Sequence, residues 1–406
     1  MRIDADWLKA EPLQTLLLLL EKNGEEARVN GGAVRNALMG MPVADVDVSS
    51  TLVPRDVMLR LKEAGHRAIP TGVEHGTVTA VIDGGSFEVT TLRQDIETDG
   101  RHARVLYGKD WEADARRRDL TINALYVDRH GEVFDPLDAM PDIERSVVRF
   151  IDDAETRIRE DYLRILRFFR FFAWYGKFRP DADGLKACAR LKDGLDTLSA
   201  ERVWQELWKT LSAPDPSRAI LWMRQTNVLS RILPESEKWG IENLSKLVES
   251  DANAGREPDA MLRLMSIIPP QNERVESLAS RLRIPNKQRD RLRDWAEAVL
   301  PDAKLSKTEF ARLLYRGKPN AVADRLKLAI ATTPEPSLKK SYIEKLDMAL
   351  SWQRPEIPVR GQDLLDHGME PGPGIAQELA KLEEAWIESD FSLSREELLK
   401  LHEGRS

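Results

Sequence analysis

Gly31-Gly32-Ala33-Val34-Arg35 stands shortly before Asp45-Val46-Asp47, and a helix-like stretch, residues 36–41, joins the two motifs. Alternation along a strand would place Asp45 and Asp47 on one face. Neighbouring carboxylates repel unless a cation bridges them, and Mg²⁺ is commonly held by one or two carboxylates together with substrate phosphates. Paired glycines let backbone N–H groups approach a triphosphate, and Arg35 can add charge-assisted hydrogen bonds. The stretch therefore predicts a phosphate site with metal ions.

Each part of this pattern also has an ordinary structural interpretation. An Asp-x-Asp pair alone is weak evidence for a metal site, because acidic pairs at strand ends are common and mostly solvated. The double glycine and Arg35 beside the pair favour the phosphate site. Glu88 alternates with Phe87 and Val89 on a neighbouring predicted strand. It is either a third carboxylate of the cluster or a solvent-facing strand residue, and the pattern leaves both open.

Length and composition describe a multidomain globular protein. With 406 residues, two to four compact units are expected, and 42% hydrophobic and 32% charged residues are far from a disordered composition. The longest apolar run, Leu16 to Leu20, is much shorter than the about 20 residues of a membrane span, and no secretory leader precedes it. The single cysteine, Cys188, cannot form an internal disulfide. We therefore expect a cytoplasmic protein with no membrane partner.

The distribution of charge says more about partners than the net charge. A formal charge of −7 argues mildly against nucleic-acid binding, because phosphate contacts normally come from surplus lysine and arginine. Arginines nevertheless cluster within residues 116–118, 157–179 and 281–293, whereas acids dominate from Glu370 onward. Such clusters are usually solvated helix faces, so alone they favour RNA only weakly.

The periodicity changes once along the chain and predicts an α+β fold. Residues 43–48, 77–82 and 86–91 read as antiparallel strands, the last two joined as a hairpin through Asp83-Gly84-Gly85. Residues 125–127 and 132–134 read as another strand pair. Nearly everything after Ala154 has helical period, beginning with one helix from about Ala154 to Tyr175. Proline-rich segments at 213–216, 269–270, 333–336 and 371–374 predict breaks between later helices.

The motifs resemble those of a known family. Residues 31–47 and Arg117-Arg118-Asp119-Leu120-Thr121-Ile122-Asn123-Ala124-Leu125 are similar to the class II CCA-adding tRNA nucleotidyltransferases and their bacterial poly(A) polymerase relatives. Residues 160–171 resemble the nucleotide-selecting helix of that family, and residues 198–204 resemble its neck helix. Together these segments cover roughly residues 28 to 210 and are specific in combination.

The resemblance implies a fold and a division into domains. It implies an N-terminal nucleotidyltransferase head of the polymerase β type, with a small mixed or antiparallel sheet, followed by all-helical neck, body and tail domains. We expect the head at residues 1–140, the neck at 141–213, the body at 214–300 and a tRNA-binding tail at 301–406. Residues 361–368, the segment 371–374 and a helix containing Trp386 resemble the C-terminal part of tRNA-binding members.

The resemblance also implies a reaction and a set of site residues. The tRNA 3′-hydroxyl would attack the α-phosphorus of CTP or ATP in line, with Mg²⁺ at Asp45 and Asp47 and release of pyrophosphate. Asp45, Asp47 and Glu88 are the candidate catalytic residues. The candidate nucleotide-binding residues are Gly31, Gly32, Arg35, Arg118, Asp119, Asn123, Asp161, Arg164, Arg167 and Arg170.

The resemblance implies that residues 160–171 select the base, and helical spacing is consistent with that role. On one continuous helix Asp161, Arg164 and Arg167 would project within one arc and could meet a single base. A carboxylate accepts from the amino group of cytosine or adenine, whereas uracil and guanine present a carbonyl oxygen to it. The alternative is an arginine-rich outer face of an amphipathic helix whose apolar stripe forms core, and both interpretations can hold together.

Two features of this chain bear on the same chemistry. Asn36 stands where relatives usually carry aspartate; we expect its side chain to orient Arg35 instead of binding metal, with a mild effect. The linker from Arg93 to Asp114, with Gly100 and Gly108, resembles the mobile loop with which such enzymes switch from C to A, and is otherwise an ordinary surface loop.

Three alternatives to full CCA addition remain open from the sequence. They are a poly(A) polymerase, a partial enzyme that adds only CC or only A, and a noncatalytic RNA-binding protein that retains the fold. Intact Asp45 and Asp47 speak against the last of these. The sequence does not fix the oligomeric state.

Overall fold

A computed structural model describes residues 1–99, 102–236 and 240–403. Contacts between residues divide the chain into two compact units, Met1–Glu237 and Lys238–Ser406. In the described residues no helix is both long enough and apolar enough to cross a membrane. The predicted division into four domains stays a prediction, and the boundary between the two units falls inside the expected body, residues 214–300.

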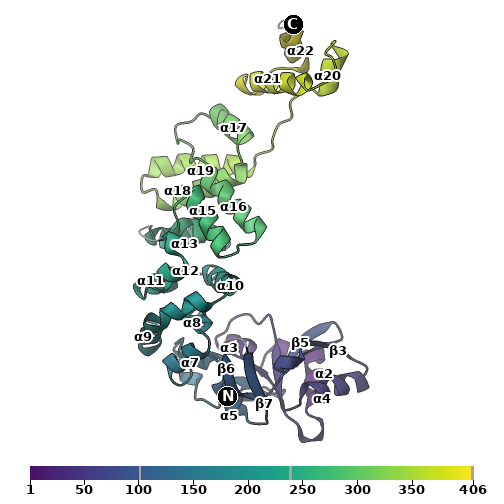
Figure 1. Ribbon diagram of the computed structural model, residues 1–406, viewed down its shortest axis with the longest axis vertical. Helices are drawn as coiled ribbons and strands as arrows, with labels where there is room; N and C mark the ends of the chain where they lie inside the picture. The colour runs from purple at the N-terminus through teal and green to yellow at the C-terminus, as the bar shows by residue number, and fades with distance from the viewer. Residues whose placement is uncertain (100–101, 237–239, 404–406) are drawn as a thin grey trace. The chain divides into compact units, whose positions relative to one another are not determined.

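The first unit is built on a seven-stranded mixed sheet (Figure 1). Its strand order is β3-β4-β5-β2-β1-β8-β9. The α+β prediction is confirmed. The strands are β1 (Ala27–Asn30), β2 (Asp47–Ser50), β3 (Arg67–Gly72), β4 (Thr77–Ile82), β5 (Gly85–Thr91), β8 (Tyr126–Val127) and β9 (Val133–Phe134).

Strand directions correct one prediction. The β4–β5 hairpin and the β8–β9 pair are antiparallel, as predicted. However, β2 and β5 pair in parallel, so the expectation that all three N-terminal strands are antiparallel was wrong. The connection between β2 and β5 passes through a helix and two further strands, and such a long crossover can bring the second strand back in the same direction.

The sheet separates an apolar face from a polar one. Val48 of β2 is paired with Val29 of β1 and Val89 of β5, and all three side chains are buried. The alternate row contains Asn30, Asp47 and Glu88. Because side chains alternate along strands, the two rows point to opposite faces. Two helices, α2 (Glu11–Leu20) and α4 (Pro54–Glu63), pack on strands of this sheet and bury leucines of the run 16–20 as core.

A separate β-hairpin occupies most of the predicted loop. Strands β6 (Arg93–Asp99) and β7 (His102–Tyr107) form a two-stranded antiparallel sheet. The segment from Arg93 to Asp114 is therefore more regular than a surface loop. Gly100, which we singled out there, lies outside the described residues.

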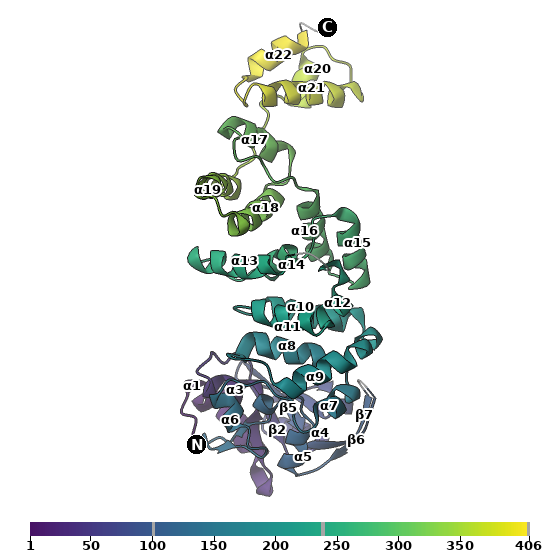
Figure 2. The same ribbon diagram turned by 90° about the vertical axis from the view of Figure 1, so that its left-hand side faces the viewer.

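Helices complete the first unit, and one of them differs from the prediction. The expected helix from Ala154 to Tyr175 is two helices, because Asp161 between them has an extended backbone. Helices α10 and α11 both pack on α8 (Figure 2). The helices of this unit are α1 (Asp6–Lys9), α2, α3 (Gly32–Leu38), α4, α5 (Trp111–Arg116), α6 (Met140–Glu144), α7 (Ala154–Glu160), α8 (Leu163–Tyr175), α9 (Ala182–Leu191), α10 (Ala200–Leu211), α11 (Ser217–Gln225) and α12 (Val228–Ile232), with short 3-10 turns at Lys22–Gly24, Val73–His75, Thr121–Asn123, Lys192–Thr197 and Pro234–Ser236.

The second unit is helical in its described residues. Breaks fall at the predicted proline-rich segments: one helix ends at Ile267 before Pro269-Pro270, and another ends at Thr332 before Pro334. Prolines lack the N–H that would continue the helical ladder, which explains why these boundaries are readable from the sequence. The helices are α13 (Glu242–Asn253), α14 (Ala260–Ile267), α15 (Asn272–Arg281), α16 (Asn286–Glu297), α17 (Lys307–Arg316), α18 (Pro319–Thr332), α19 (Pro336–Leu350), α20 (Gly361–Asp366), α21 (Gly374–Glu388) and α22 (Arg395–Glu403).

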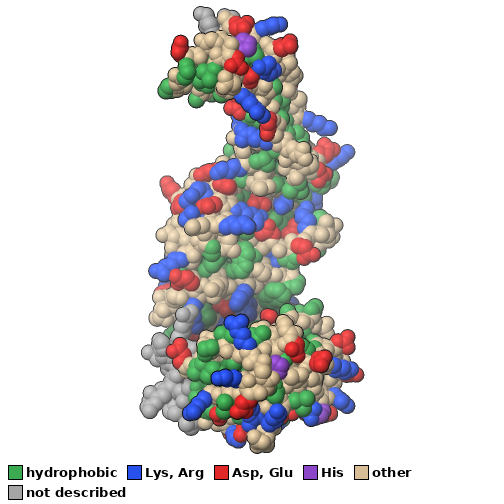
Figure 3. All heavy atoms as spheres, turned by 90° about the vertical axis from the view of Figure 1, so that its right-hand side faces the viewer, with side chains coloured by type: hydrophobic (Ala, Val, Ile, Leu, Met, Phe, Trp, Pro, Cys, Tyr) green, Lys and Arg blue, Asp and Glu red, His purple; other side chains and the backbone are tan. Residues whose placement is uncertain are grey.

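The basic run at residues 281–293 is largely neutralised inside this unit. Arg291 donates to the carboxylates of Asp259 and Asp324, and Arg293 pairs with Glu276. Lysine and arginine side chains alternate with acidic ones over the face shown in Figure 3. The arginine count of this run therefore overstates the positive charge that it offers to RNA.

Candidate active site

Two carboxylates meet on the polar face of the sheet. Asp47 of β2 and Glu88 of β5 are register partners in the parallel pair. Asp45 precedes the first residue of β2, so the expectation that Asp45 and Asp47 share one face of a strand was wrong. Their charges nevertheless act together: partial burial, then the negative charges of Glu88 and Asp45, raise the pKa of the Asp47 carboxyl above its ordinary value.

These carboxylates fit a magnesium site that substrate completes. Within the described residues, no hydrogen bond or ion pair neutralises Asp45, Asp47 or Glu88. Also within the described part of the chain, no set of three or more acidic, histidine or cysteine side chains is gathered closely enough to enclose an ion. Mg²⁺ usually keeps water and phosphate oxygens in its shell and takes only one or two protein carboxylates. An open, anionic, unpaired group at this position has the chemistry that such a site requires.

A glycine turn leads from the sheet into the site. Gly31 follows β1 with φ of 61°, in the left-handed region that favours glycine. Its N–H donates to the carbonyl of Leu125 at 3.1 Å, which ties the turn to the neighbouring strand segment. A Cβ at Gly31 would come within 3.4 Å of an Arg118 nitrogen. The turn therefore brings the backbone close to the Arg118 guanidinium. The predicted approach of its N–H groups to a triphosphate stays a prediction.

Arg35 is a buried anchor of the site. Its guanidinium donates to Asn123 Oδ1 at 2.5 Å and to the Tyr175 hydroxyl at 2.7 Å. Asn36 Oδ1 accepts from Arg35 Nε and Nη2 at 3.1 and 2.9 Å. This confirms the expectation that Asn36 orients Arg35. Burial lowers the pKa of Arg35, although the Tyr175 hydroxyl opposes that effect.

Arg118 is fixed in place by a buried carboxylate. Asp114 is fully buried and accepts from Arg118 Nη2 at 3.1 Å, Arg117 Nε at 2.7 Å and the Tyr126 hydroxyl at 2.8 Å. Burial alone would raise the pKa of Asp114, but the charges of Arg117 and Arg118 outweigh it and hold the pKa below its usual range. Arg118 also donates to Asn30 Oδ1 at 2.9 Å. The guanidinium is thus held rigidly beside the Asp47 row of the sheet.

A second carboxylate fixes the arginines of α8. Asp119 accepts from Arg167 Nε at 2.5 Å and from Asn123 Nδ2 at 3.1 Å. Burial opposes ionisation, but Arg167 prevails and the pKa of Asp119 lies well below its ordinary range. Arg164 is held by Glu160, Nη1 to Oε2 at 2.5 Å. Contacts within the protein therefore hold both arginines in position.

Asp161 reaches the site by a different route from the predicted one. It stands between α7 and α8, where its Oδ1 accepts from the Leu163 N–H at 3.1 Å, as in an Asx turn. Its Oδ2 accepts from Arg202 Nη2 of α10 at 2.6 Å. Helical spacing therefore relates Arg164 to Arg167 on α8, but it was the wrong reason for the proximity of Asp161 to them. Asp161 joins them through the interruption between α7 and α8 and its contact with Arg202 of α10.

These groups line one pocket with a volume of about 510 Å³. Six arginines and three aspartates line it, so it is positively charged in a chain of net charge −7. Ten of the thirteen predicted site residues belong to the lining, but Asp45, Glu88 and Arg170 do not. Arg170 instead pairs with Glu206 at 2.6 Å. The lining is Asn30, Gly31, Gly32, Arg35, Asp47, Arg117, Arg118, Asp119, Asn123, Asp161, Leu163, Arg164, Arg167, Phe171 and Arg202.

The sequence prediction missed several members of this pocket. Arg117 and Arg202 were quoted within motifs without being singled out, and Asn30 ends the strand before the glycine turn. Asp114 precedes Arg117 and Arg118 by three and four residues, a spacing that typically brings helical side chains together and could have identified it. Nothing local in the sequence links Arg202 to Asp161, because the two residues belong to different elements.

Comparisons with known proteins agree with this geometry. Residues 27–149 match the family described as poly A polymerase head domain, and residues 177–239 match the probable RNA and SrmB-binding site of polymerase A. The chain is 35% identical over 401 residues to the mitochondrial CCA tRNA nucleotidyltransferase 1 of Mus musculus, covering 97% of this chain and 90% of that protein. It is 30% identical over 405 residues to a CCA-adding enzyme of Streptococcus pyogenes, covering 97% and 96%.

Solved structures show the same architecture. The CCA-adding enzyme of Bacillus stearothermophilus in complex with CTP superimposes with a TM-score of 0.75 at 25% identity, covering 97% of this chain and 98% of that one. The Thermotoga maritima CCA-adding enzyme complexed with tRNA gives a TM-score of 0.70 at 20% identity and covers both chains completely, which supports the fold. The likeness extends over both units of the chain.

Proposed function

The chain belongs to the family of CCA-adding tRNA nucleotidyltransferases, and from this membership we propose that it adds the 3′-terminal CCA to tRNA. The substrates are CTP and ATP, the reaction needs no nucleic-acid template, and pyrophosphate is released. The observation that carries the proposal is the pocket in which six arginines and Asp47 surround a glycine turn. A positively charged pocket with an adjacent anionic cluster suits a triphosphate and its metal.

We further propose that Asp45 and Asp47 hold Mg²⁺, with Glu88 contributing negative charge beside them. When bound, Mg²⁺ supplies Lewis-acid stabilisation of the charge that develops on the triphosphate oxygens. Asp47 is the ligand inside the pocket lining, and Asp45 approaches it from the segment before β2. The raised pKa of Asp47 supports this assignment, because burial and then the charges of Glu88 and Asp45 disfavour its ionised form, and a divalent cation would stabilise that form.

The arginines of the pocket have a positioning role in the proposed reaction. The tRNA 3′-hydroxyl oxygen forms a bond to the α-phosphorus while the bond to the pyrophosphate oxygen breaks. Arg118 and Arg167 are already fixed by Asp114 and Asp119, so they can meet phosphate oxygens with little reorganisation. The buried Arg35 binds Asn123, Asn36 and Tyr175 and holds the turn itself. We therefore assign it to the support of the nucleotide site.

Asp161 and Arg164 are proposed to read the base. The Asp161 carboxylate has acceptor capacity beyond its bonds to Leu163 and Arg202, and it can accept from the amino group shared by cytosine and adenine. Arg164 offers donors to the adjoining ring nitrogen or carbonyl. Arg202 holds the carboxylate from the far side, so it is a positioning residue for the same discrimination.

tRNA is the proposed acceptor, and the compartment is a separate proposal. The C-terminal helices α20 and α21 carry the residues that resemble tRNA-binding tails. Cys188 is buried, so no disulfide chemistry argues for an oxidising compartment. Vertebrate relatives are named as mitochondrial proteins. We propose the cytoplasm for this chain, and fractionation of the source cells would test that assignment.

One assay separates the proposed activity from its rivals. Pure protein, Mg²⁺ and tRNA lacking its 3′ end are incubated with CTP, with ATP and with both. We expect two additions from CTP alone and three from the mixture. A poly(A) polymerase adds many A residues to any RNA, a partial enzyme stops at CC or adds only A, and a noncatalytic protein adds nothing. Any of these three results would overturn the proposal.

A further inference from the structure

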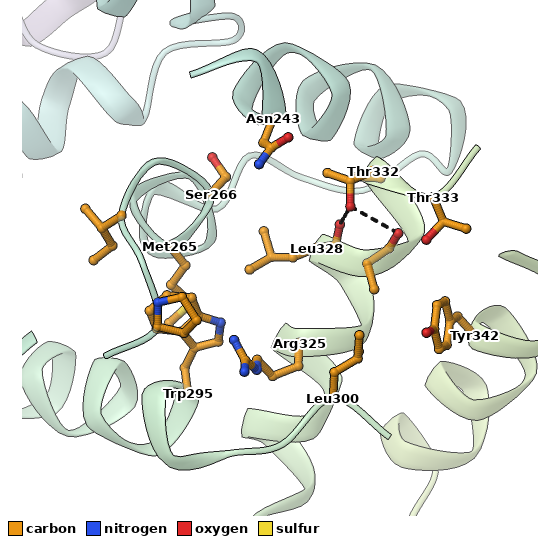
Figure 4. A pocket seen from close by; sticks show the side chains of 14 residues that line it. Asn243, Met265, Ser266, Trp295, Leu300, Arg325, Leu328, Thr332, Thr333 and Tyr342 are labelled. Carbon is orange, nitrogen blue, oxygen red and sulfur yellow. Dashed lines mark hydrogen bonds between the residues drawn. The ribbon is translucent and has the colours of Figure 1, made fainter. Parts of the chain in front are cut away.

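The helical unit contains a second cavity whose residues the nucleotidyl transfer does not use. It has a volume of about 340 Å³ and is lined by fourteen residues (Figure 4). They come from α13, α14, α16, α18, α19 and the segments after α14, α16 and α18. The lining is Asn243, Met265, Ser266, Ile268, Pro270, Trp295, Leu300, Arg325, Leu328, Ala329, Ala331, Thr332, Thr333 and Tyr342.

Two donors in this cavity lack an acceptor. Trp295 is only 1% exposed, and among the residues that the structure describes no acceptor bonds to its buried indole nitrogen. Nε of Arg325 is likewise buried without a partner. The two groups lie together, because the Arg325 guanidinium stands 5.6 Å from the centre of the Trp295 ring. A buried donor without an acceptor is energetically costly, so two together call for an occupant.

The charge of the cavity is also uncompensated. None of the fourteen lining residues is an aspartate or glutamate, and in the described residues 240–403 no ion pair to Arg325 is present. Burial lowers the pKa of Arg325, and no neighbouring charge opposes that effect. By contrast, Arg291 is held by Asp259 and Asp324. Arg325 is thus a cation that the fold itself leaves unneutralised.

Within the described residues, none of the other polar groups of the lining accepts from the Trp295 indole nitrogen or from Arg325 Nε. The two dashed lines in Figure 4 mark the Thr332 hydroxyl donating to the carbonyls of Leu328 at 3.0 Å and Ala329 at 3.4 Å. Ser266 donates to the carbonyl of Arg263. Most of the other lining is apolar, with Met265, Leu300 and Leu328 projecting toward the space. The cavity therefore combines an anion-binding end with an apolar body.

We propose that this cavity binds a small organic anion, whose carboxylate or phosphate group accepts from Arg325 and Trp295 and whose apolar body fills the space between α14 and α18. The volume lies within the range of small-molecule sites. A polynucleotide backbone suits the cavity less well, because its phosphates are flanked by polar sugars and the lining between α14 and α18 is largely apolar. The site is independent of nucleotidyl transfer.

Indole N–H resonances of the full-length ¹⁵N-labelled protein test the proposal directly. The Trp295 signal, one of ten tryptophan indoles, is assigned by its loss in Trp295→Phe. The probes are benzoate, phenyl phosphate, inorganic phosphate and benzyl alcohol, a neutral molecule of similar size. We expect saturable shifts of this signal with benzoate or phenyl phosphate, and the tighter of the two identifies the preferred head group. Inorganic phosphate and benzyl alcohol should bind at least about tenfold more weakly.

Variants distinguish a ligand site from a structural one. Arg325→Met should weaken probe binding about tenfold or more while leaving Tm without probe equal or higher, because it removes a partly buried cation whose Nε has no acceptor among the described residues. Arg325→Lys should retain part of the affinity. Lys340→Met, an exposed charge change on α19, is the matched control and should bind as the unchanged protein does.

Several results would overturn the proposal. The first is the absence of any shift with either organic anion, which would leave an ordered water as the only occupant. The second is equal binding of benzyl alcohol and the organic anions. The third is a shift with tRNA but not with the small anions. A lowered Tm of Arg325→Met together with unchanged probe affinity would assign Arg325 to the fold alone. None of these results would affect the CCA-addition assay, so the two proposals fail separately.

Discussion

Asp47 and Glu88 are register partners on two parallel strands, and this pairing sets two carboxylates side by side on the polar face of the sheet. The pairing exists because β5 returns beside β2 after a long crossover. Partial burial and the charges of Glu88 and Asp45 raise the pKa of Asp47. Without a cation the neighbouring carboxylates repel one another. A substitution of Asp47 should therefore show both how much this repulsion lowers the stability of the fold and how much the carboxylate contributes to metal binding.

Replacing Asp47 with asparagine should separate activity from stability. A carboxyl whose pKa is higher in the folded than in the unfolded protein lowers stability once the pH rises above the unfolded value of about 3.9. Because Asp47→Asn removes a proposed metal ligand, we expect it to reduce the rate of nucleotidyl transfer by more than about hundredfold. Near pH 7 in EDTA its Tm should equal or exceed that of the unchanged protein. Calorimetry with and without Mg²⁺ checks this, and a clear loss of Tm in EDTA would contradict it.

The ion pair of Asp119 and Arg167 should support the fold in a pH-dependent way. The pKa of Asp119 is lowered in the folded protein, so its contribution is present above about pH 3.9 and is lost as the pH falls below that. Arg167→Met leaves a buried carboxylate without its main partner. Since Arg167 is one-third exposed, we expect a loss of about 2 kcal/mol near pH 7.

Urea unfolding at pH 7 and at pH 3 measures this effect. The difference between the unchanged protein and Arg167→Met should shrink at pH 3. Glu206→Gln, which breaks the Arg170 pair outside the pocket lining, is the matched control for losing an arginine–carboxylate contact. Equal losses for Arg167→Met at both pH values would show that the carboxylate charge is not the cause.

Asn36 should tolerate aspartate better than leucine. The Asn36 Oδ1 accepts from Arg35, and the Asn36 Nδ2 donates to the Pro42 carbonyl at 2.8 Å. Because a guanidinium only donates and a carbonyl only accepts, these two partners determine which way the Asn36 amide points. An aspartate at this position would retain the contact with Arg35 but lose the contact with the Pro42 carbonyl, which lies on the segment that leads to Asp45. We expect Asn36→Asp to lower the transfer rate about threefold and Asn36→Leu about tenfold or more. Equal rates for all three proteins would exclude a positioning role.

The elements that were predicted correctly are those with local causes. The β4–β5 hairpin follows from Asp83 and Gly84, which both adopt positive φ, and the later helix ends follow from prolines. The break at Asp161 has no proline or glycine to announce it. Its cause is the contact with Arg202 from another helix, together with an Asx turn. The parallel β2–β5 pair likewise depends on a crossover that no short sequence window contains.

The same distinction holds for the site. Gly31, Arg118 and Asp119 were found because their motifs are contiguous. Arg202 enters the pocket only through tertiary packing. Arg170 has the same helical spacing as Arg164 and Arg167 but pairs with Glu206 instead. Sequence spacing therefore identified which segments meet, and packing decided which side chains of each segment face the pocket.

Asp161→Ala should alter nucleotide choice more than metal use. Removal of the carboxylate deletes the acceptor for the base amino group and frees Arg202. We expect misincorporation of UTP or GTP relative to CTP to rise about tenfold, with little change in the Mg²⁺ concentration needed for half-maximal rate. Competition assays with mixed nucleotides measure the ratio. Arg202→Met should give a smaller change in the same direction, and unchanged incorporation ratios for Asp161→Ala would refute the base-reading role.

Anomalous diffraction from crystals soaked in manganese and a nonhydrolysable CTP analogue tests the metal assignment most directly. Mn²⁺ stands in for Mg²⁺ because both prefer oxygen ligands. A peak is expected between Asp45 and Asp47, and it should vanish in Asp47→Asn. No peak there with the triphosphate bound, or a peak that survives the substitution, would contradict the proposed catalytic centre.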